Sequence, residues 1–319
     1  MTLPSNLTFL SPPGEVADWR LVVLCDAAGS AGVFDELPGT APAIARRLGL
    51  HPHGVRVVLD ALVAFGVVER RDDDAYVATA DTPDADTAAT IRHHARALRR
   101  WAMTVDHRLR GEQGGDPIGM ADPETFHDSL AATARKTAPE VVDVCLARFP
   151  DAKTVLDLGG LHGEYSLEFN RRGLKATMQD MPGMIEVARK KGRLEAAGVE
   201  LYEGSFFDTV PDGPFDLAFC SGITHTFGAD GNLALFGNLR KVVAPGGGVA
   251  VVTFLRRRNP VAALFAVQMM LNDNNGDTHT EAEYREWLGS VGFAVDEDVL
   301  DLADQGARSV LFATCSAVR

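Results

Sequence analysis

Short apolar stretches alternate with helical patterns in the second half of the chain, and this alternation limits the fold more than any other feature. The apolar stretches are KTVLDLGG, LKATMQDM, VELYEGSFF, FDLAFCSG and GGVAVVTF, between residues 153 and 254. Helical patterns separate them at 164–171, 184–197 and 232–243. Strands that alternate with helices at this spacing form a parallel, doubly wound sheet in an α/β fold. Such a sheet binds ligands at the carboxyl ends of its strands, where the strand order reverses.

The loop after the first apolar stretch reads DLGGLHGE and leads into a helical pattern, which is the context of a cofactor loop. A dinucleotide fingerprint G-x-G-x-x-G that starts at Gly159 would need glycine at two positions where the chain has Leu161 and Glu164. A carboxylate at the start of the helix competes with a pyrophosphate for the positive end of the helix dipole. The loop therefore disfavours NAD and FAD.

S-adenosylmethionine (SAM) suits the same loop better, because it carries an ammonium and a sulfonium instead of phosphates. The pattern D-x-G-x-x-x-G, formed by Asp157, Gly159 and Gly163, lets the backbone approach the ligand and leaves a carboxylate to face its positive charge. Asp180 follows 23 residues after Asp157, at the end of the second stretch, where an acid can accept both ribose hydroxyls. Phe206, after the third stretch, could lie beside the adenine. The alternative is that the glycines only form a tight turn.

The N-terminal part has the order helix, turn, helix, hairpin, which is typical of a winged helix. Thr40 and Pro42 begin a helix that Gly49 ends. HPHGVRVVLDALVAFG predicts the second helix, and VVERRDDDAYVAT predicts two strands around an acidic turn. Residues 44–78 contain five arginines and five acidic residues, so their net charge is zero. Because a DNA reader needs a basic face, we expect an assembly module.

Composition limits the location and the partners. The 319 residues carry a net charge of −13, which repels nucleic acid and anionic membranes. No apolar run approaches the ~20 residues of a membrane span, and the N-terminus does not resemble an export signal. The four cysteines include no CxxC pair, as expected in a reducing compartment. We therefore expect a cytoplasmic protein with no membrane or nucleic-acid partner.

Five stretches in matching order and spacing resemble one family, the class I SAM-dependent small-molecule O-methyltransferases with an N-terminal winged-helix dimerisation domain. This family includes bacterial polyketide-tailoring and plant caffeate-type enzymes. The stretches are TVLDLGGLHGEYS, MQDMPGMIEVA, EGSFFDTVP, FDLAFCSGITHTFGADGNLALFGNLRKVVAPGGGVAVV and GDTHTEAEYREWLGSVGF. The resemblance covers residues ~15–319.

The resemblance implies a Rossmann-like doubly wound sheet behind a mainly helical N-terminal domain. The implied domains are a winged-helix dimerisation domain (1–95), a helical linker that caps the acceptor pocket (96–150) and a SAM-binding catalytic domain (151–319). A helix is predicted over 140–149, with Pro139 at its start. The chain would form a homodimer through its N-terminal domain.

The resemblance also assigns roles to single residues. The cofactor, which leaves as S-adenosyl-homocysteine (SAH), would be held by Asp157, Gly159, Gly160, Gly163, Asp180, Met181, Ser205, Phe206 and Ser221. His225 follows the fourth stretch and would act as the general base for a phenol or enol, since an unperturbed histidine titrates near ~6.5. The alternative interpretation is that His225 has a structural role only. The acceptor pocket would include Met103, Phe126, Met269 and His279.

Several departures from the family pattern affect the catalytic part. Leu161 replaces a glycine, His162 a small polar residue and Thr226 an aspartate. Asp230, Asp273 or Asp277 could orient His225 in place of that aspartate; otherwise proximity alone would act on an acceptor that is already ionised. His225 and His279 have no identified third ligand, so no metal is expected.

The expected function is methyl transfer to a hydroxyl of a small aromatic or polyketide-like secondary metabolite, as in antibiotic biosynthesis. Three alternatives stay open. One is C- or N-methylation of a related metabolite, for example an α-keto acid with help from a metal. Another is a non-methylating enzyme on the same scaffold. The third is a SAM-responsive winged-helix regulator that binds DNA.

Overall fold

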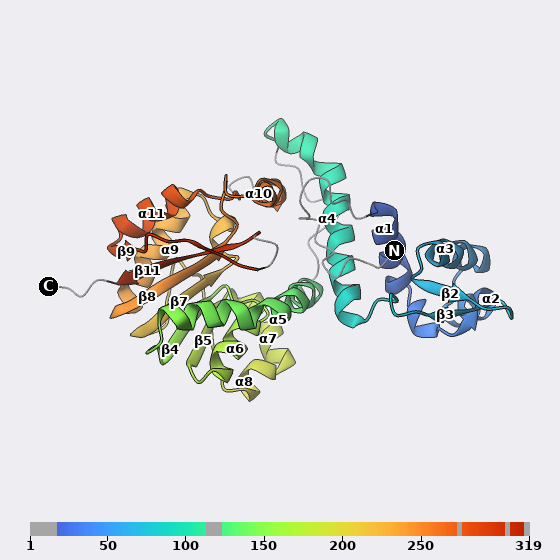
Figure 1. Cartoon of the computed structure of the whole chain (residues 1–319), viewed down its shortest axis with the longest axis horizontal. Coiled ribbons are helices and arrows are strands. Elements are labelled where there is room, and N and C mark those ends of the chain that lie inside the picture. Colours follow the sequence, from blue (N-terminus) through green and yellow to red (C-terminus); the bar gives the residue numbers. More distant parts are fainter. Residues whose placement is uncertain (1–17, 113–122, 273–275, 304–306, 316–319) are drawn as a thin grey trace. The chain divides into compact units, whose positions relative to one another are not determined.

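The computed structural model describes residues 18–112, 123–272, 276–303 and 307–315 (Figure 1). The chain divides into two compact units, residues 1–103 and 104–319. The division falls within helix α4 (Ala85–Leu109), whereas the sequence predicted boundaries after residues 95 and 150. Within the described ranges, no helix is both long enough and apolar enough to cross a bilayer.

The first unit is mainly helical and carries one small sheet. Its elements are α1 (Trp19–Ser30), η1 (Phe34–Glu36), β1 (Gly39–Thr40), α2 (Ala41–Leu48), α3 (Pro52–Ala64), β2 (Val68–Arg70), β3 (Ala75–Ala78) and the first part of α4. The strand order is β1-β3-β2. The predicted order of helix, turn, helix and hairpin is confirmed, and Gly49 ends α2 in the left-handed conformation.

A compact core explains why these helices and strands hold together. The largest buried side chains come from different elements and include Ile44 of α2, Leu59 and Leu62 of α3, and Ile91 of α4. The hydroxyl of Tyr76 on β3 donates to a carboxylate oxygen of Asp60 on α3 at 2.6 Å, which ties the hairpin to the second helix.

The second unit is built on a sheet in which eight of the described strands take part. They are β4 (Thr154–Leu158), β5 (Lys175–Asp180), β6 (Glu200–Glu203), β7 (Phe215–Ser221), β8 (Val243–Thr253), β9 (Phe293–Val295), β10 (Leu300–Asp301) and β11 (Ser309–Cys315). The order is β10-β11-β8-β7-β4-β5-β6, and β9 pairs with β11. Strands β4 to β8 are parallel, which confirms all five predicted strands. The order reverses between β4 and β7, so a ligand site is expected there.

Helices cover both faces of this sheet (Figure 1). The described helices of this unit are α5 (Pro123–Arg148), α6 (Glu164–Arg171), α7 (Pro182–Lys191), α8 (Arg193–Ala196), α9 (Ala229–Val242), α10 (Pro260–Asn272) and α11 (Glu281–Ser290), with η2 (Thr224–Thr226) after β7. Side chains alternate between the faces, as a strand requires. Val155 packs into the core cluster that includes α5, α6 and α7, and Leu156 into the one that includes α9 and α11.

Two helix predictions were wrong in their bounds. The single helix predicted over 184–197 is two helices, because Gly192 takes a left-handed conformation (φ 64°) that ends α7. The helix predicted to start at Pro139 starts at Pro123, and Pro139 lies inside it. Both differences concern helices that position the glycine loop described next.

Candidate active site

The glycine loop turns sharply between β4 and α6. Gly159, Leu161 and Gly163 all have positive φ angles (65°, 45° and 68°). The N–H of Leu161 donates to Oδ2 of Asp180 at 2.8 Å, which ties the loop to the end of β5. For a leucine, the left-handed conformation costs roughly 1–2 kcal/mol. The chain therefore holds a strained leucine at the position where the sequence resemblance predicts glycine.

The glycines are needed for packing as well as for the turn. A Cβ atom on Gly160 would lie 2.5 Å from Cγ of Met178 and 2.8 Å from Oδ2 of Asp157. A Cβ on Gly163 would lie 2.5 Å from Cδ1 of Leu194. These contacts are with the protein itself, so the tight turn would require glycines 160 and 163 with or without a ligand.

Two buried carboxyl groups lie at this edge of the sheet. Burial raises the pKa of Asp157 to about 7; a hydrogen bond from the Ser166 hydroxyl at 2.6 Å opposes this shift, and the nearby charge of Asp180 adds to it. Burial also raises the pKa of Asp180, although the backbone N–H groups of Met181 (2.7 Å) and Leu161 donate to it. Each carboxylate gains from a positive charge placed between them, because that charge offsets the cost of burial.

Glu164, at the first position of α6, is paired and does not face the loop as an isolated charge. Its side chain is only 6% exposed. Arg193 contacts both of its oxygens at 2.7 Å, and Arg135 contacts one at 3.0 Å. Burial raises the pKa of Glu164, but the hydrogen bonds and charges of the two arginines outweigh it and leave the pKa below its usual value. The repulsion of a pyrophosphate by this carboxylate is therefore weaker than the sequence suggested.

His162 offers a different reason why this helix start is a poor phosphate site. Its Nδ1 accepts the N–H of Glu164 at 3.1 Å, so that donor is already used. Burial lowers the pKa of His162 to about 4, which keeps the ring neutral near pH 7. Because that N–H is already bonded, the N-terminus of α6 has one fewer free donor for an anion.

The residues after β6 do not all face outward. Phe206 is 4% exposed and belongs to the core cluster under α9, whereas Phe207 is 42% exposed. The Phe207 ring lies 5.0 Å from that of Phe227. Ser205 accepts the N–H of Phe207 at 3.3 Å, and Met181 after β5 is exposed. Sequence reasoning selected Phe206, which is the buried ring; in a Phe-Phe pair the pattern alone does not show which ring is buried.

His225 lies in η2, just after the Ser221 end of β7, and is 7% exposed. Its ring packs edge-to-face on Phe265 of α10, with centroids 4.6 Å apart. Burial, with a smaller contribution from the nearby His279, lowers its pKa to about 3. Its Nδ1 is buried and has no hydrogen-bond partner.

None of the candidate carboxylates that the structure describes orients His225. Asp277 pairs with Arg256 at 2.5 Å, and Asp230 is exposed with no bond to the imidazole. Asp273 lies outside the described residues. The hydroxyl of Thr226 donates to the carbonyl of Ile223 at 2.6 Å instead of contacting the ring.

His279 is used within the loop that carries His225. Its Nε2 donates to the carbonyl of Phe227 at 2.8 Å, and its ring packs edge-to-face on Trp287 at 4.8 Å. This leaves little of the side chain for an acceptor molecule. Across the residues that the structure describes, no three His, Cys, Asp or Glu side chains are grouped to hold a metal ion.

Asn232, in the first turn of α9, was not selected from the sequence. It is fully buried, and its amide nitrogen lies 3.0, 3.0 and 3.2 Å from the carbonyl oxygens of Thr224, Phe227 and Gly228. One side chain thus closes the loop that carries His225. Only its place seven residues after the histidine, at a helix start, could have indicated this.

We expect Asn232→Ala to lower the free energy of unfolding by about 1–3 kcal/mol, because buried carbonyl groups lose their donor. Turnover should fall by more than the folded fraction explains, since the loop is no longer held. Urea unfolding and steady-state rates measure the two effects. The control is Asp230→Asn, an exposed position in the same turn, which should change stability by less than about 0.5 kcal/mol. Equal effects of both variants would contradict the role of Asn232.

The remaining acceptor candidates differ in burial. Met103, the last residue of the first unit, is exposed. In the second unit, Phe126 of α5 is half-buried and Met269 of α10 is buried against Gly276. A small cavity beside the glycine loop is lined by His127, His162, Ala188, Lys191, Arg193 and Leu194.

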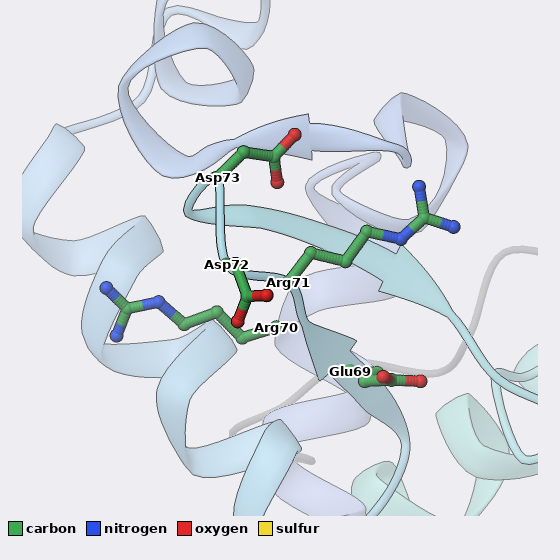
Figure 2. Close-up of a pocket in the computed structure, with 5 residues that line it drawn as sticks. All are labelled: Glu69, Arg70, Arg71, Asp72 and Asp73. Atoms are coloured by element: carbon green, nitrogen blue, oxygen red, sulfur yellow. The ribbon is translucent and has the colours of Figure 1, made fainter.

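An open hollow in the first unit lies at the turn of the hairpin formed by β2 and β3. It is lined by Glu69, Arg70, Arg71, Asp72 and Asp73, and Figure 2 shows the two arginines pointing in different directions. Arg70 pairs with Asp74 at 2.6 Å. The residues that line this hollow therefore carry charges of both signs.

Comparison with known proteins agrees with this architecture. Residues 122–294 match the O-methyltransferase domain family. The tetracenomycin polyketide synthesis 8-O-methyltransferase of Streptomyces glaucescens is 30% identical, over 78% of this chain and 80% of that protein. The 3-hydroxy-5-methyl-1-naphthoate 3-O-methyltransferase of Streptomyces sahachiroi is 24% identical, over 92% and 91%.

Solved structures share the fold. An O-methyltransferase family protein from Burkholderia thailandensis superposes with a TM-score of 0.78 at 23% identity, covering 94% of this chain and 96% of that one. Human N-acetylserotonin methyltransferase, solved in complex with SAM, has a TM-score of 0.78 at 21% identity, covering 94% and 95%. The family match and the tetracenomycin relative establish the class: the chain belongs to the O-methyltransferase family.

Proposed function

We propose that this chain binds SAM and transfers its methyl group to a hydroxyl of a small aromatic or polyketide-like metabolite. One observation carries the cofactor: two buried carboxyl groups, Asp157 and Asp180, flank the glycine loop at the point where the strand order reverses. A cationic ligand relieves the burial of both groups, whereas a pyrophosphate would add to the negative charge. The donor set therefore fits SAM and leaves NAD disfavoured.

The substrate class rests on the relatives. Those named above act on a tetracenomycin polyketide and on a hydroxy-methyl-naphthoate, and a third, 25% identical over 88% of this chain and 86% of that protein, is the mitomycin biosynthesis 6-O-methyltransferase of Streptomyces lavendulae. All three names describe oxygen methylation in small-molecule biosynthesis. A phenolic or enolic hydroxyl of such a molecule is the acceptor that we propose here.

The proposed roles follow the geometry of the loop. Asp180 accepts the ribose hydroxyls with the lone pairs that Leu161 and Met181 leave free, and Asp157 offsets the positive charge of the methionine part. Met181, Ser205 and the exposed Phe207 border the adenine, while Phe206 supports them from the core. Gly159, Gly160, Gly163 and Ser221 line the methionine side. Bound SAM supplies the electrophilic methyl group, and the protein holds the acceptor oxygen in line with it.

We further propose the domain roles that the family resemblance implied. Residues 1–95 would pair two copies in a homodimer, 96–150 would link and cap the acceptor pocket, and 151–319 would carry catalysis in the cytoplasm. Met103, Phe126 and Met269 are the proposed acceptor contacts. The neutral charge balance of residues 44–78 supports assembly over DNA binding.

Calorimetry tests the cofactor directly. Injection of SAH should give a saturable heat, and injection of NADH should give none. Incubation with SAM and a panel of phenolic and enolic acceptors, followed by mass detection of one added methyl group, tests the reaction. Heat from NADH without heat from SAH would overturn the proposal.

A further inference from the structure

We propose that the acceptor hydroxyl is an acidic one that reaches the site already ionised, and that Nε2–H of His225 donates a hydrogen bond to its oxygen instead of removing a proton. The substrate class is then a vinylogous acid, such as a hydroxyquinone or the enol of a 1,3-dicarbonyl. This inference rests on the proposed function. The acceptor oxygen forms the new bond to the methyl carbon, the sulfur–carbon bond breaks with its electron pair going to sulfur, and no proton is transferred.

The first argument concerns the tautomer of His225. A base that accepts a proton at Nε2 carries its hydrogen on Nδ1, and a carboxylate or carbonyl normally holds that hydrogen. Nδ1 of His225 is buried without a partner. A hydrogen there would be a buried donor with nothing to bond, which proteins avoid more strictly than an unpaired acceptor. The site therefore favours the hydrogen on Nε2, where it can only be donated.

The second argument concerns the groups around the ring. Phe265 of α10 covers one side of the ring, and the titratable side chain that shifts its pKa is His279, which is itself bonded to the carbonyl of Phe227. The N–H of Asp277 donates to the carbonyl of His225 at 3.1 Å, but its carboxylate faces Arg256. Among the described residues, no anion is bonded to the ring to stabilise an imidazolium.

The third argument is one of magnitude. Burial lowers the pKa of His225 to about 3, while an unperturbed phenol titrates near ~10. Proton transfer from such a phenol to this ring would therefore be strongly unfavourable. An acceptor that is an anion at neutral pH avoids this step, so proximity and alignment with the methyl group are sufficient.

The ring also lies where an acceptor oxygen must come. Gly222 follows β7 with a φ of 69°, and a Cβ placed on it would lie 3.6 Å from Cε1 of His225. The Cε1 corner, between the two nitrogens, thus faces the carboxyl end of β7. With Nδ1 sealed in the interior, Nε2 is the nitrogen left to meet the acceptor.

Nuclear magnetic resonance tests the tautomer without any acceptor. Long-range ¹H–¹⁵N spectra of the ¹⁵N-labelled full chain, assigned by comparison with His225→Gln, should show a neutral ring protonated at Nε2 from pH 5 to pH 8. A ring protonated at Nδ1, or one that titrates near ~6.5 as free histidine does, overturns the inference.

Kinetics tests the substrate class with a matched pair of acceptors of similar size. 2-Hydroxy-1,4-naphthoquinone, ionised at neutral pH, should be methylated at a rate that is flat between pH 6 and pH 9. 2-Naphthol, protonated at neutral pH, should react more slowly at pH 7 and gain about tenfold per pH unit as it ionises. With the quinone, His225→Ala and His225→Gln should lower turnover less than about tenfold, the limit of a positioning role.

The outcomes separate this inference from the function on which it rests. Failure of the wild type to bind SAH in the calorimeter removes the proposed function. Binding of SAH together with rapid, pH-independent methylation of 2-naphthol and a fall of more than about 100-fold in both His225 variants removes only the inference, because it identifies His225 as a general base.

Discussion

Replacing both arginines that flank Glu164 should lower the free energy of unfolding by about 3–5 kcal/mol, the cost of leaving a buried charge without its partner. The double variant Arg135→Met, Arg193→Met keeps an unbranched apolar stem at both positions and removes both cations. Glu164 is 6% exposed, so its carboxylate cannot turn to water without moving the start of α6. Arg135 is 38% exposed and Arg193 is 49% exposed. Each single variant keeps the other arginine beside Glu164, so it should lower the free energy of unfolding much less.

Urea unfolding of the single, double and triple variants measures this effect. The matched control adds Glu164→Gln to the double variant, which removes the unpaired charge and should recover most of the loss. The double variant should also bind SAH more weakly, because α6 starts directly after the glycine loop. A double variant as stable as the wild type would mean that the carboxylate gains its stabilisation elsewhere, and a triple variant no better than the double would assign the loss to packing.

Much of this fold could be predicted because the hydrophobic periodicity and the composition of a strand or helix are properties of a short stretch of sequence. The five parallel strands are short apolar runs, and each begins and ends within a few residues of its predicted place. The two errors in helix bounds have physical causes. Gly192 ends a helix only because its backbone turns left-handed, and Pro139 is tolerated inside α5 because the helix packs on the sheet through Val141, Val142 and Cys145. Tertiary packing outweighs local propensity in such cases.

In the candidate site, only the residues that follow from the ends of the strands could be predicted. Asp157, Asp180 and His225 were selected because parallel strands bring their carboxyl ends to one edge, and the structure has them there. The contacts that support the surrounding loops could not be predicted, because each of them joins residues from different elements of the chain. Arg135 and Arg193 reach Glu164 from 29 residues away on either side, and Asn232 was an ordinary helix residue in the sequence.

Asp180→Ala should weaken SAH binding by about 3 kcal/mol, or more than roughly 100-fold, since each hydrogen bond to a charged group contributes about 1.5–3 kcal/mol. Part of this loss would come from the ribose, whose hydroxyls lose a charged acceptor. Another part would come from the loop, because the N–H groups of Leu161 and Met181 now bond to Asp180 at 2.8 and 2.7 Å. A single affinity measurement cannot separate the two parts.

A chemical double-mutant cycle separates them. Wild type and Asp180→Ala are each titrated with SAH and with its 2′-deoxy analogue, and the coupling between the two changes is the part that belongs to the hydroxyl. A coupling of about 1.5–3 kcal/mol supports a direct bond from the ribose to Asp180. Asp180→Asn, which keeps one carbonyl oxygen, should lose less than the alanine variant. If the two losses are additive, Asp180 acts on the loop only. Its carboxylate would then hold Leu161 in its strained conformation, and the ribose would have to bind elsewhere.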